Sequence, residues 1–322
     1  MSTIMDKPVA AGSRLAAFLS RYALLISLAV LVVLAQVVSK GSFLGSNNLI
    51  NVLAQNSVAG LLAVGQTMVI LTSGIDLSLG SITALSSMVV LLMQSQGSLV
   101  ARLSGLAVAL ACGLVNGVLV TKGRIPPFIA TLGMMQVALG LAYVLGGGFA
   151  KYEEPHVPLL GSSDTIGPIP LIIVVWLVVA VLAWLIVKRT RYGSYIYATG
   201  GNERAARVSG VRTARVKIFV YVMAGLFAGV AGILYINRLG YSQPQIGGSL
   251  TLASIAPVVV GGTSLFGGIG GVWNTVAGVL IVGVLVNLMV LTGVNANIQQ
   301  AVQGLLVLVV VSVFVRRQRR TR

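Results

Sequence analysis

Few residues in this chain could carry out chemistry on a substrate. The 322 residues include one cysteine, Cys112, one histidine, His156, and six acidic residues. An enzyme active site needs a nucleophile with a nearby base, or a cluster of metal-ligating side chains. With so few reactive groups, neither a nucleophile with its base nor a cluster of metal ligands is expected in this chain. We therefore predict that the chain has no catalytic site of its own, no metal site and no cofactor.

Asp76 is the acidic residue that calls for an explanation. It is the one acid between Asp6 and Glu153, and it lies between two long apolar stretches. A carboxylate within or beside a membrane is costly unless it is paired, capped or hydrated. Asp76 could cap a helix that begins at Leu77, with Ser78 adding a hydroxyl to the exposed N–H groups. The other reading is a gate or substrate contact, and we favour the cap.

A set of amide side chains falls inside apolar stretches that could cross a membrane. A buried amide needs a hydrogen-bond partner or water, so these residues are candidates for the lining of a translocation path, together with Asp76 and Ser78. Hydrogen bonding between neighbouring helices is the alternative role for each of them. The set comprises Asn56, Gln66, Asn116, Gln136 and Asn287.

A short segment in a basic loop has the pattern of a small, sharply bounded helix. Asn202 is a good N-cap, Glu203 suits the first turn, Arg207 suits the last turn, and Gly210 provides a stop. A capped helix of two turns outside the membrane is suited to docking on a partner protein, although a solvated loop is the simpler alternative. The segment contains Gly200, Gly201, Asn202, Glu203, Arg204, Ala205, Ala206, Arg207 and Gly210.

The composition indicates the elements that carry these residues. The chain is 57% hydrophobic and 9% charged, with a mean hydropathy of +0.98, whereas ordinary soluble domains are about 25% charged. We therefore predict an all-α membrane protein of about ten transmembrane helices. The span at 250–265 contains Pro257 and could be broken or re-entrant. The predicted spans are 22–38, 49–71, 77–95, 99–120, 127–147, 168–187, 217–236, 250–265, 272–292 and 297–315.

The basic residues predict the orientation of these spans. Ten spans place 18 of the 22 Lys and Arg residues on one side, which the positive-inside rule assigns to the cytoplasm. Both termini are then cytoplasmic. The prediction comprises an N-terminal segment 1–21, one transmembrane domain 22–315 with a cytoplasmic loop 188–217, and a basic tail 316–322. Topology also explains the net charge of +16, so we expect no nucleic acid as a partner.

Four ordered motifs carry a resemblance to a known family. The segments 74–81, 122–133, 200–210 and 261–268 resemble, in order and spacing, the ribose-type permeases of ABC sugar importers. The resemblance covers roughly residues 40–315. It implies a bacterial inner-membrane permease that pairs with a second permease copy, a cytoplasmic ATPase subunit and a periplasmic sugar-binding protein. It also implies that segment 200–210 is the helix that couples the permease to the ATPase.

One motif departs from the family pattern, and one other class of transporter stays open. Where many relatives have two acidic residues before the glycine-rich turn, this chain has the segment 251–257, without acids and with Pro257. An ion-coupled secondary carrier would place titratable residues in mid-membrane. Apart from Asp76, no acid falls inside a predicted span. The sequence therefore predicts the permease subunit of a sugar or polyol importer, with an ion-coupled carrier as the alternative.

Overall fold

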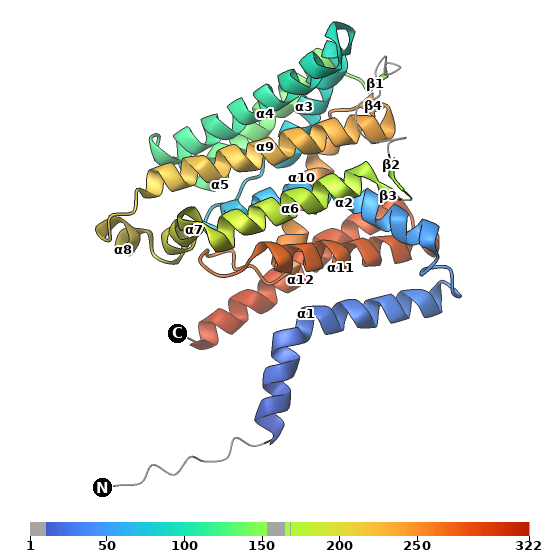
Figure 1. The fold of residues 1–322 in the computed structure, drawn as a ribbon, viewed down its shortest axis with the longest axis vertical. Coiled ribbons are helices and arrows are strands. Elements are labelled where there is room, and N and C mark those ends of the chain that lie inside the picture. Colours follow the sequence, from blue (N-terminus) through green and yellow to red (C-terminus); the bar gives the residue numbers. More distant parts are fainter. Residues whose placement is uncertain (1–10, 153–164, 168, 322) are drawn as a thin grey trace.

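The computed structural model describes residues 11–152, 165–167 and 169–321. His156, Glu153, Glu154 and Asp164 lie outside the described residues, and so does the first part of the N-terminal segment 1–21. The described chain is a bundle of long helices whose axes run roughly along one direction (Figure 1). The helices are α1 (Ala11–Val38), α2 (Ser46–Leu71), α3 (Leu79–Met93), α4 (Ser98–Thr121), α5 (Pro127–Gly146), α6 (Leu171–Arg189), α7 (Arg191–Gly201), α8 (Glu203–Val208), α9 (Thr213–Leu239), α10 (Ile246–Val260), α11 (Val272–Leu291) and α12 (Ala296–Thr321).

Short strands and a 3-10 turn lie at one end of the bundle, opposite the end that carries α7 and α8 (Figure 1). The turn η1 (Gln94–Gln96) extends α3. The strands β1 (Lys151–Tyr152) and β4 (Tyr241–Ser242) pair antiparallel, and so do β2 (Thr165–Ile166) and β3 (Ile169–Pro170). We call the opposite end, where α7 and α8 lie, the α8 end.

Every predicted span overlaps a helix of the bundle. Within the described residues, seven helices are long and apolar enough to cross a membrane. The other three spans coincide with shorter apolar helices, at 22–38, 246–260 and 296–309. The described chain is thus an all-α, polytopic membrane protein. The span predicted at 250–265 starts four residues earlier and is one continuous helix, α10, with Pro257 in its last turn.

Helix α9 lies at the centre, and glycines let its neighbours approach it closely. A Cβ atom at Gly113 of α4 would crowd the backbone of Tyr221, and one at Gly225 of α9 would crowd Ala109. On the far side, Trp176 of α6 lies over Gly60 of α2. Small residues at helix contacts are expected where lipid gives apolar side chains no reason to associate. The high glycine content therefore serves helix packing.

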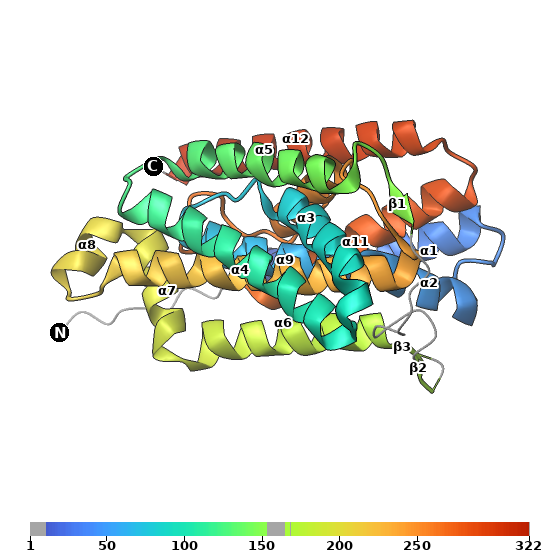
Figure 2. The ribbon, with the colours of Figure 1, turned by 90° about the horizontal axis from the view of Figure 1, so that it is seen from above.

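The bundle has two distinct sides around this centre. Seen from above, α5 and α12 lie on one side and α6 lies on the other, with α9 between them (Figure 2). Helix α1 packs along α11 at the edge. Helix α5 buries only five of its 20 residues, namely Ala130, Thr131, Met134, Ala138 and Ala142. The side formed by α5 and α12 therefore presents exposed helix surface in the single chain.

Candidate functional site

The short helix predicted in the basic loop is present as α8. The Asn202 side chain accepts a hydrogen bond from the Ala205 N–H at 3.0 Å, which is the N-cap that the sequence predicts. At the other end Gly210 has a φ of +86°, its N–H donates to Arg207 O, and the next N–H donates to Ala206 O. Those two bonds form a Schellman motif. Both ends of α8 are therefore fixed by local contacts.

The sequence missed a helix that precedes α8. Residues 191–201 form α7, capped by the Thr190 hydroxyl, which accepts from the Gly193 N–H at 3.3 Å. Gly200 and Gly201 end α7, so they do not belong to α8. Helix α8 therefore stands at the end of a helical arm that continues from α6 through α7.

The two alanines of α8 face different surroundings. Ala205 is exposed whereas its neighbour Ala206 is 6% exposed, so the two alanines do not form one docking face. The helix instead presents Arg204, Ala205 and Val208, and Val208 is 86% exposed. An apolar side chain this open at the tip of the molecule is a candidate contact for a partner.

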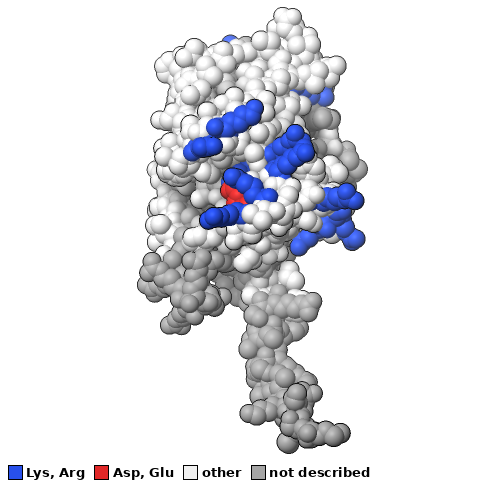
Figure 3. All heavy atoms as spheres, turned by 90° about the vertical axis from the view of Figure 1, so that its left-hand side faces the viewer, with Lys and Arg blue, Asp and Glu red and all other residues white. Residues whose placement is uncertain are grey.

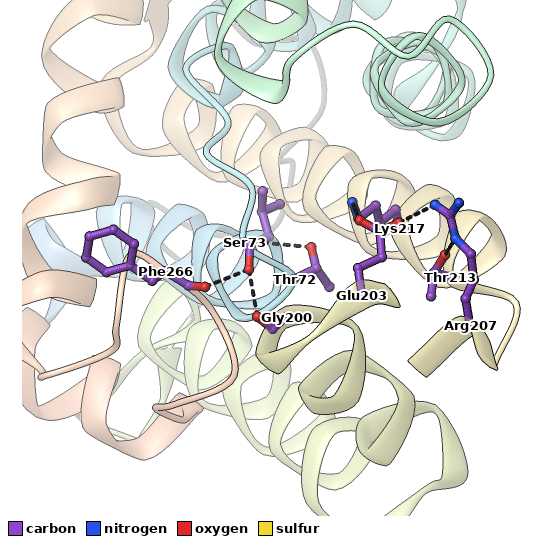
Figure 4. Close-up of polar contacts among 9 residues, drawn as sticks. Thr72, Ser73, Gly200, Glu203, Arg207, Thr213, Lys217 and Phe266 are labelled. Carbon is purple, nitrogen blue, oxygen red and sulfur yellow. Dashed lines mark hydrogen bonds and ion pairs between the residues drawn. The ribbon is translucent and has the colours of Figure 1, made fainter. Parts of the chain in front are cut away.

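Ion pairs attach α8 to the start of α9 (Figure 4). The Glu203 carboxylate accepts from Lys217 Nζ at 2.6 Å and from Arg207 at 2.7 Å, and Arg207 Nε donates to Thr213 Oγ1 at 3.1 Å. Burial raises the pKa of the Glu203 carboxyl, but the hydrogen bonds from Lys217 and Arg207 outweigh burial and hold the pKa below its ordinary value. Glu203 is therefore ionised at neutral pH.

Ser73 joins three segments at the α8 end (Figure 4). Its hydroxyl lies 2.8 Å from Gly200 O at the end of α7 and 2.7 Å from Phe266 O in the segment 261–271 between α10 and α11, which we call the glycine-rich loop. Ser73 itself has a φ of +61°, an unfavourable conformation for a residue with a side chain. The sequence did not single out Ser73, because its partners lie 127 and 193 residues away.

Glycines make this junction tight enough for backbone to touch backbone. A Cβ atom at Gly200 would overlap the carbonyl oxygen of Leu71, and the N–H of Gly268 donates to that same oxygen at 3.1 Å. The Tyr197 hydroxyl of α7 donates to Gly270 O at 2.8 Å. The glycine-rich loop thus packs α7 against the end of α2.

Three of the predicted polar residues, Gln66, Ser78 and Asn116, come together with Asp76. Asp76 Oδ1 accepts from the N–H and the hydroxyl of Ser78 at 2.8 and 2.6 Å. The Asn116 amide of α4 donates to Ser78 Oγ at 2.8 Å and lies 3.4 Å from Asp76 Oδ2. The Gln66 amide of α2, oriented to satisfy both of its ends, donates to Asp76 O at 3.0 Å and accepts from Asp76 N. All four residues are fully buried.

The predicted cap at Asp76 is wrong in its geometry. Helix α3 begins at Leu79, and its N-cap is Ser78, whose side chain makes no cap hydrogen bond. Asp76 stands two residues before that cap and closes an Asx turn on Ser78 instead. The turn satisfies the loop backbone, not the first N–H groups of the helix.

The segment 72–78, which we call the connector, touches most of the bundle. Besides Gln66, Asn116 and the partners of Ser73, the Thr131 hydroxyl of α5 lies 3.2 Å from Ile75 O. The Thr251 hydroxyl of α10 lies 3.1 Å from Leu77 O. The connector therefore contacts the α8 end through the Ser73 hydroxyl, and it contacts α5 and α10 through hydrogen bonds to its own backbone.

The remaining predicted amides lie elsewhere. Asn56 donates to Val52 O within its own helix at 2.7 Å. Asn287 exchanges two amide hydrogen bonds with Asn48, at 3.0 and 3.1 Å, so its role is the interhelical one. Gln136 is exposed halfway along α5. The structure thus joins Gln66, Ser78 and Asn116 to Asp76 and leaves these three outside that cluster.

Comparisons with known proteins assign the chain to a family. Residues 48–311 match the family described as branched-chain amino acid transport system / permease component. The ribose import permease protein RbsC of Escherichia coli K12 is 42% identical over 91% of this chain and 93% of its own length. RbsC of Bacillus subtilis is 39% identical over 89% and 90%, and the fructose import permease protein FrcC of Rhizobium meliloti is 34% identical over 86% and 80%.

These matches favour the importer over the ion-coupled carrier. They span nearly the whole transmembrane bundle, including the connector, α8 and the glycine-rich loop. Permeases of this kind are multi-pass proteins of the inner membrane and act as transport subunits. The chain is a member of the ribose-type permease family of ABC sugar importers.

Proposed function

We propose that this chain carries a monosaccharide of the ribose, fructose or allose type across the inner membrane. The observation that carries the proposal is the identity of 34–42% to permeases named for those sugars, over at least 80% of each relative's length. A periplasmic binding protein delivers the sugar, and a separate ATPase subunit supplies the energy. Two copies of this chain form the path.

The proposed orientation places the α8 end in the cytoplasm. Lys and Arg side chains gather on this face around a single acidic patch (Figure 3). Basic residues are retained on the cytoplasmic side. Ten crossings then bring both termini to the same side as α8.

Helix α8 is proposed to dock on the ATPase subunit. Its two ends are fixed by Asn202 and Gly210, and its ion pairs hold it on α9. The open Val208 and Ala205 form the contact surface. A short helix held this firmly can transmit force rather than bend.

The connector is proposed to carry that force to the sugar path. A shift of α7 moves Gly200, and Ser73 bonds to Gly200 directly. The same seven-residue segment holds Asp76 and reaches α5 through Thr131. A displacement of the α8 end would therefore be transmitted to α5 through residues that are in continuous contact.

The exposed face of α5 is proposed to meet the second copy and the sugar. Gln136 lies on this face in the middle of a 20-residue helix, where an unpaired amide in lipid is costly. Gly133 and Gly140 on the same helix have open space where a side chain would be. A water molecule, the sugar or a polar group of the second copy would provide hydrogen-bond partners for the Gln136 amide.

Sugar uptake by the reconstituted importer tests the proposal. The permease, its ATPase and its binding protein are placed in liposomes, and labelled ribose, fructose and allose are offered with ATP inside. We expect uptake of at least one sugar that requires both partners and ATP. Uptake that needs no ATP but collapses when a proton or sodium gradient is removed would support the carrier instead.

Thiol labelling tests the orientation. In a Cys112→Ala background, single cysteines at the exposed positions Ser194 of α7 and Ser95 of η1 mark the two ends of the bundle. An impermeant reagent added to intact spheroplasts should label Ser95→Cys alone. Labelling of Ser194→Cys under the same conditions would contradict the orientation.

Substitutions on α8 test the docking surface. Ala205→Trp and Val208→Asp change exposed positions, so the permease should remain folded while ATPase co-purification falls about tenfold or more, as for a contact at the centre of an interface. Arg191→Gln, an exposed change on α7, is the matched control. Full ATPase association in both α8 variants would show that α8 is not the docking surface.

A further inference from the structure

A basic cavity lies beside α8, on the face turned away from Val208. Its volume is about 690 Å³, and it lies between the last turn of α4 and the first turns of α9. Four cationic side chains line it, with one acidic side chain, Glu203. The cations are Arg124, Arg207, Arg212 and Lys217.

Two of these cations are left without a counter-charge. Glu203 is engaged by Arg207 and Lys217. The side chains of Arg124 and Arg212 make no hydrogen bond or ion pair with any residue in the described part of the chain. The lining therefore carries an excess of positive charge that the fold itself does not use.

The cavity lies level with the ends of two helices, α4 and α9, that are long and apolar enough to span a membrane. Val120 and Thr121 are the last residues of the α4 span, and Lys217 lies one turn into the α9 span. Phe128 and Ile129, in the first turn of α5 just beyond the loop of Arg124, are 54% and 58% exposed. Apolar surface that acyl chains could cover therefore follows directly on the cationic loop.

Arg124 is held in position by an unusual backbone. Its φ is +55°, and the flanking N–H groups of Gly123 and Ile125 donate to Val118 O and Leu119 O at the end of α4. A residue with a side chain adopts this conformation at a cost in free energy, and the backbone fixed in this way places Arg124 in the lining of the cavity.

We propose that this cavity binds the phosphate of an anionic phospholipid from the cytoplasmic leaflet. Arginine pairs with phosphate through two parallel hydrogen bonds, and basic pockets between transmembrane helices on this side hold anionic headgroups. Arg124 and Arg212 make the primary contacts, and Lys217 adds its charge. The cytoplasmic assignment rests on the orientation proposed above.

The residues of α8 that line this cavity differ from those that form the proposed ATPase contact. Glu203 and Arg207, one turn apart, line the cavity, whereas Ala205 and Val208 do not. An acidic side chain of the ATPase is therefore the less favoured occupant.

Lipid retention by the purified permease tests the proposal. The permease alone, in detergent, is titrated with phosphatidylglycerol or phosphatidylcholine and bound lipid is counted by native mass spectrometry. Arg124→Gln with Arg212→Gln should weaken phosphatidylglycerol binding about 25-fold, at roughly fivefold for each cation near a membrane surface. Arg191→Gln with Arg215→Gln, two exposed cations outside the cavity lining, should leave it unchanged.

Three results would overturn the proposal. Equal loss in both double variants would show a diffuse charge effect. Displacement of phosphatidylglycerol by millimolar inorganic phosphate would assign the site to free phosphate. Retained lipid with lost ATPase co-purification, in the cavity variant alone, would assign the cavity to the ATPase. Because lipid retention is measured on the permease alone, it is independent of whether sugar uptake succeeds.

Discussion

The described part of the chain holds two carboxylates, Asp76 and Glu203, in opposite environments. Glu203 lies on the surface helix α8 with a side chain 34% exposed and two cationic partners, Lys217 and Arg207. Asp76 is fully buried in the connector, and its described hydrogen-bond partners are the neutral groups of Ser78, Asn116 and Gln66. Glu203 therefore forms ion pairs, whereas Asp76 accepts hydrogen bonds from neutral groups.

The two acids therefore have different structural roles: Glu203 attaches one helix, whereas Asp76 organises several segments. The Glu203 pairs attach one short helix to the start of α9, in partial contact with water. Asp76 gathers α2, α3 and α4 around the connector, where each polar group depends on the next. Loss of an exposed ion pair costs little, whereas loss of one member of a buried network leaves several groups unsatisfied. Substitutions at the two acids should therefore differ widely in effect.

The largest effect is expected for Asp76→Ala. It leaves the Ser78 N–H, the Ser78 hydroxyl and the Asn116 amide short of an acceptor, and each buried unsatisfied group costs about 1–3 kcal/mol. We expect the unfolding temperature in detergent to fall by about 5–10 °C and sugar uptake to be lost. Intrinsic tryptophan fluorescence follows the unfolding.

Asp76→Asn is the matched control for the charge. The new side chain keeps an oxygen that can accept from the Ser78 N–H. A turned Asn116 amide presents its Oδ1 atom, which has no partner among the described residues of the unchanged protein, to the new amide and to the Ser78 hydroxyl, in place of the bond that Asn116 donates to Ser78 Oγ. We expect stability within about 1 kcal/mol of the unchanged protein and most uptake retained. Uptake abolished in a stable Asp76→Asn protein would show that the negative charge itself is required.

A smaller effect, on coupling more than on stability, is expected for Ser73→Ala. The change removes the hydroxyl that bonds Gly200 O and Phe266 O, at about 1 kcal/mol. ATPase association should persist, while sugar moved per ATP hydrolysed should fall severalfold. Both rates are measured together in liposomes.

Ser73→Gly distinguishes the effect of losing the hydroxyl from the effect of backbone strain. Glycine accepts the φ of +61° without strain, yet it also lacks the hydroxyl. If the hydrogen bonds transmit motion, Ser73→Gly should be as uncoupled as Ser73→Ala. Normal coupling in Ser73→Gly would mean that the hydroxyl is dispensable and that the connector is not the route.

Features set by local sequence could be predicted. Apolar runs of about 20 residues predict each membrane helix, because the bilayer fixes their length. The two caps of α8 follow from Asn202 and Gly210, since a capping contact reaches only a few residues along the chain. Helix α7 was missed because Gly193, Ser194 and its charged start make residues 191–201 look like a loop.

Features set by packing could not be predicted from the chain alone. The buried amides could be recognised as polar residues in apolar spans, but only the bundle shows that Gln66 and Asn116 meet at Asp76 while Gln136 is exposed. The burial of Ala206 depends on where α9 lies. Ser73 carries no local signal, because both of its partners are backbone oxygens of distant segments.

The smallest effect is expected for Glu203→Gln. The pairs with Lys217 and Arg207 are partly exposed, so their loss should cost about 1 kcal/mol or less. The pKa of Glu203 is lower in the folded protein than in the unfolded chain. The pairs therefore contribute their full stabilisation when the pH is above the pKa of the unfolded chain. That stabilisation is lost as the pH falls through the lower pKa of the folded protein. Hydrogen exchange of α8, corrected for intrinsic rates, should therefore be steady from about pH 5 to pH 7 and accelerate below about pH 4.

Glu203→Gln should exchange slightly faster than the unchanged protein at pH 7 and should lack that acceleration at low pH. Arg191→Gln, which changes an exposed charge on α7, should follow the unchanged protein at every pH. The same acceleration in Glu203→Gln would assign the acid sensitivity to another group. A loss of α8 protection at pH 7 as large as that caused by Asp76→Ala in the connector would remove the distinction between the two acids, because α8 would then depend on Glu203 as the connector depends on Asp76.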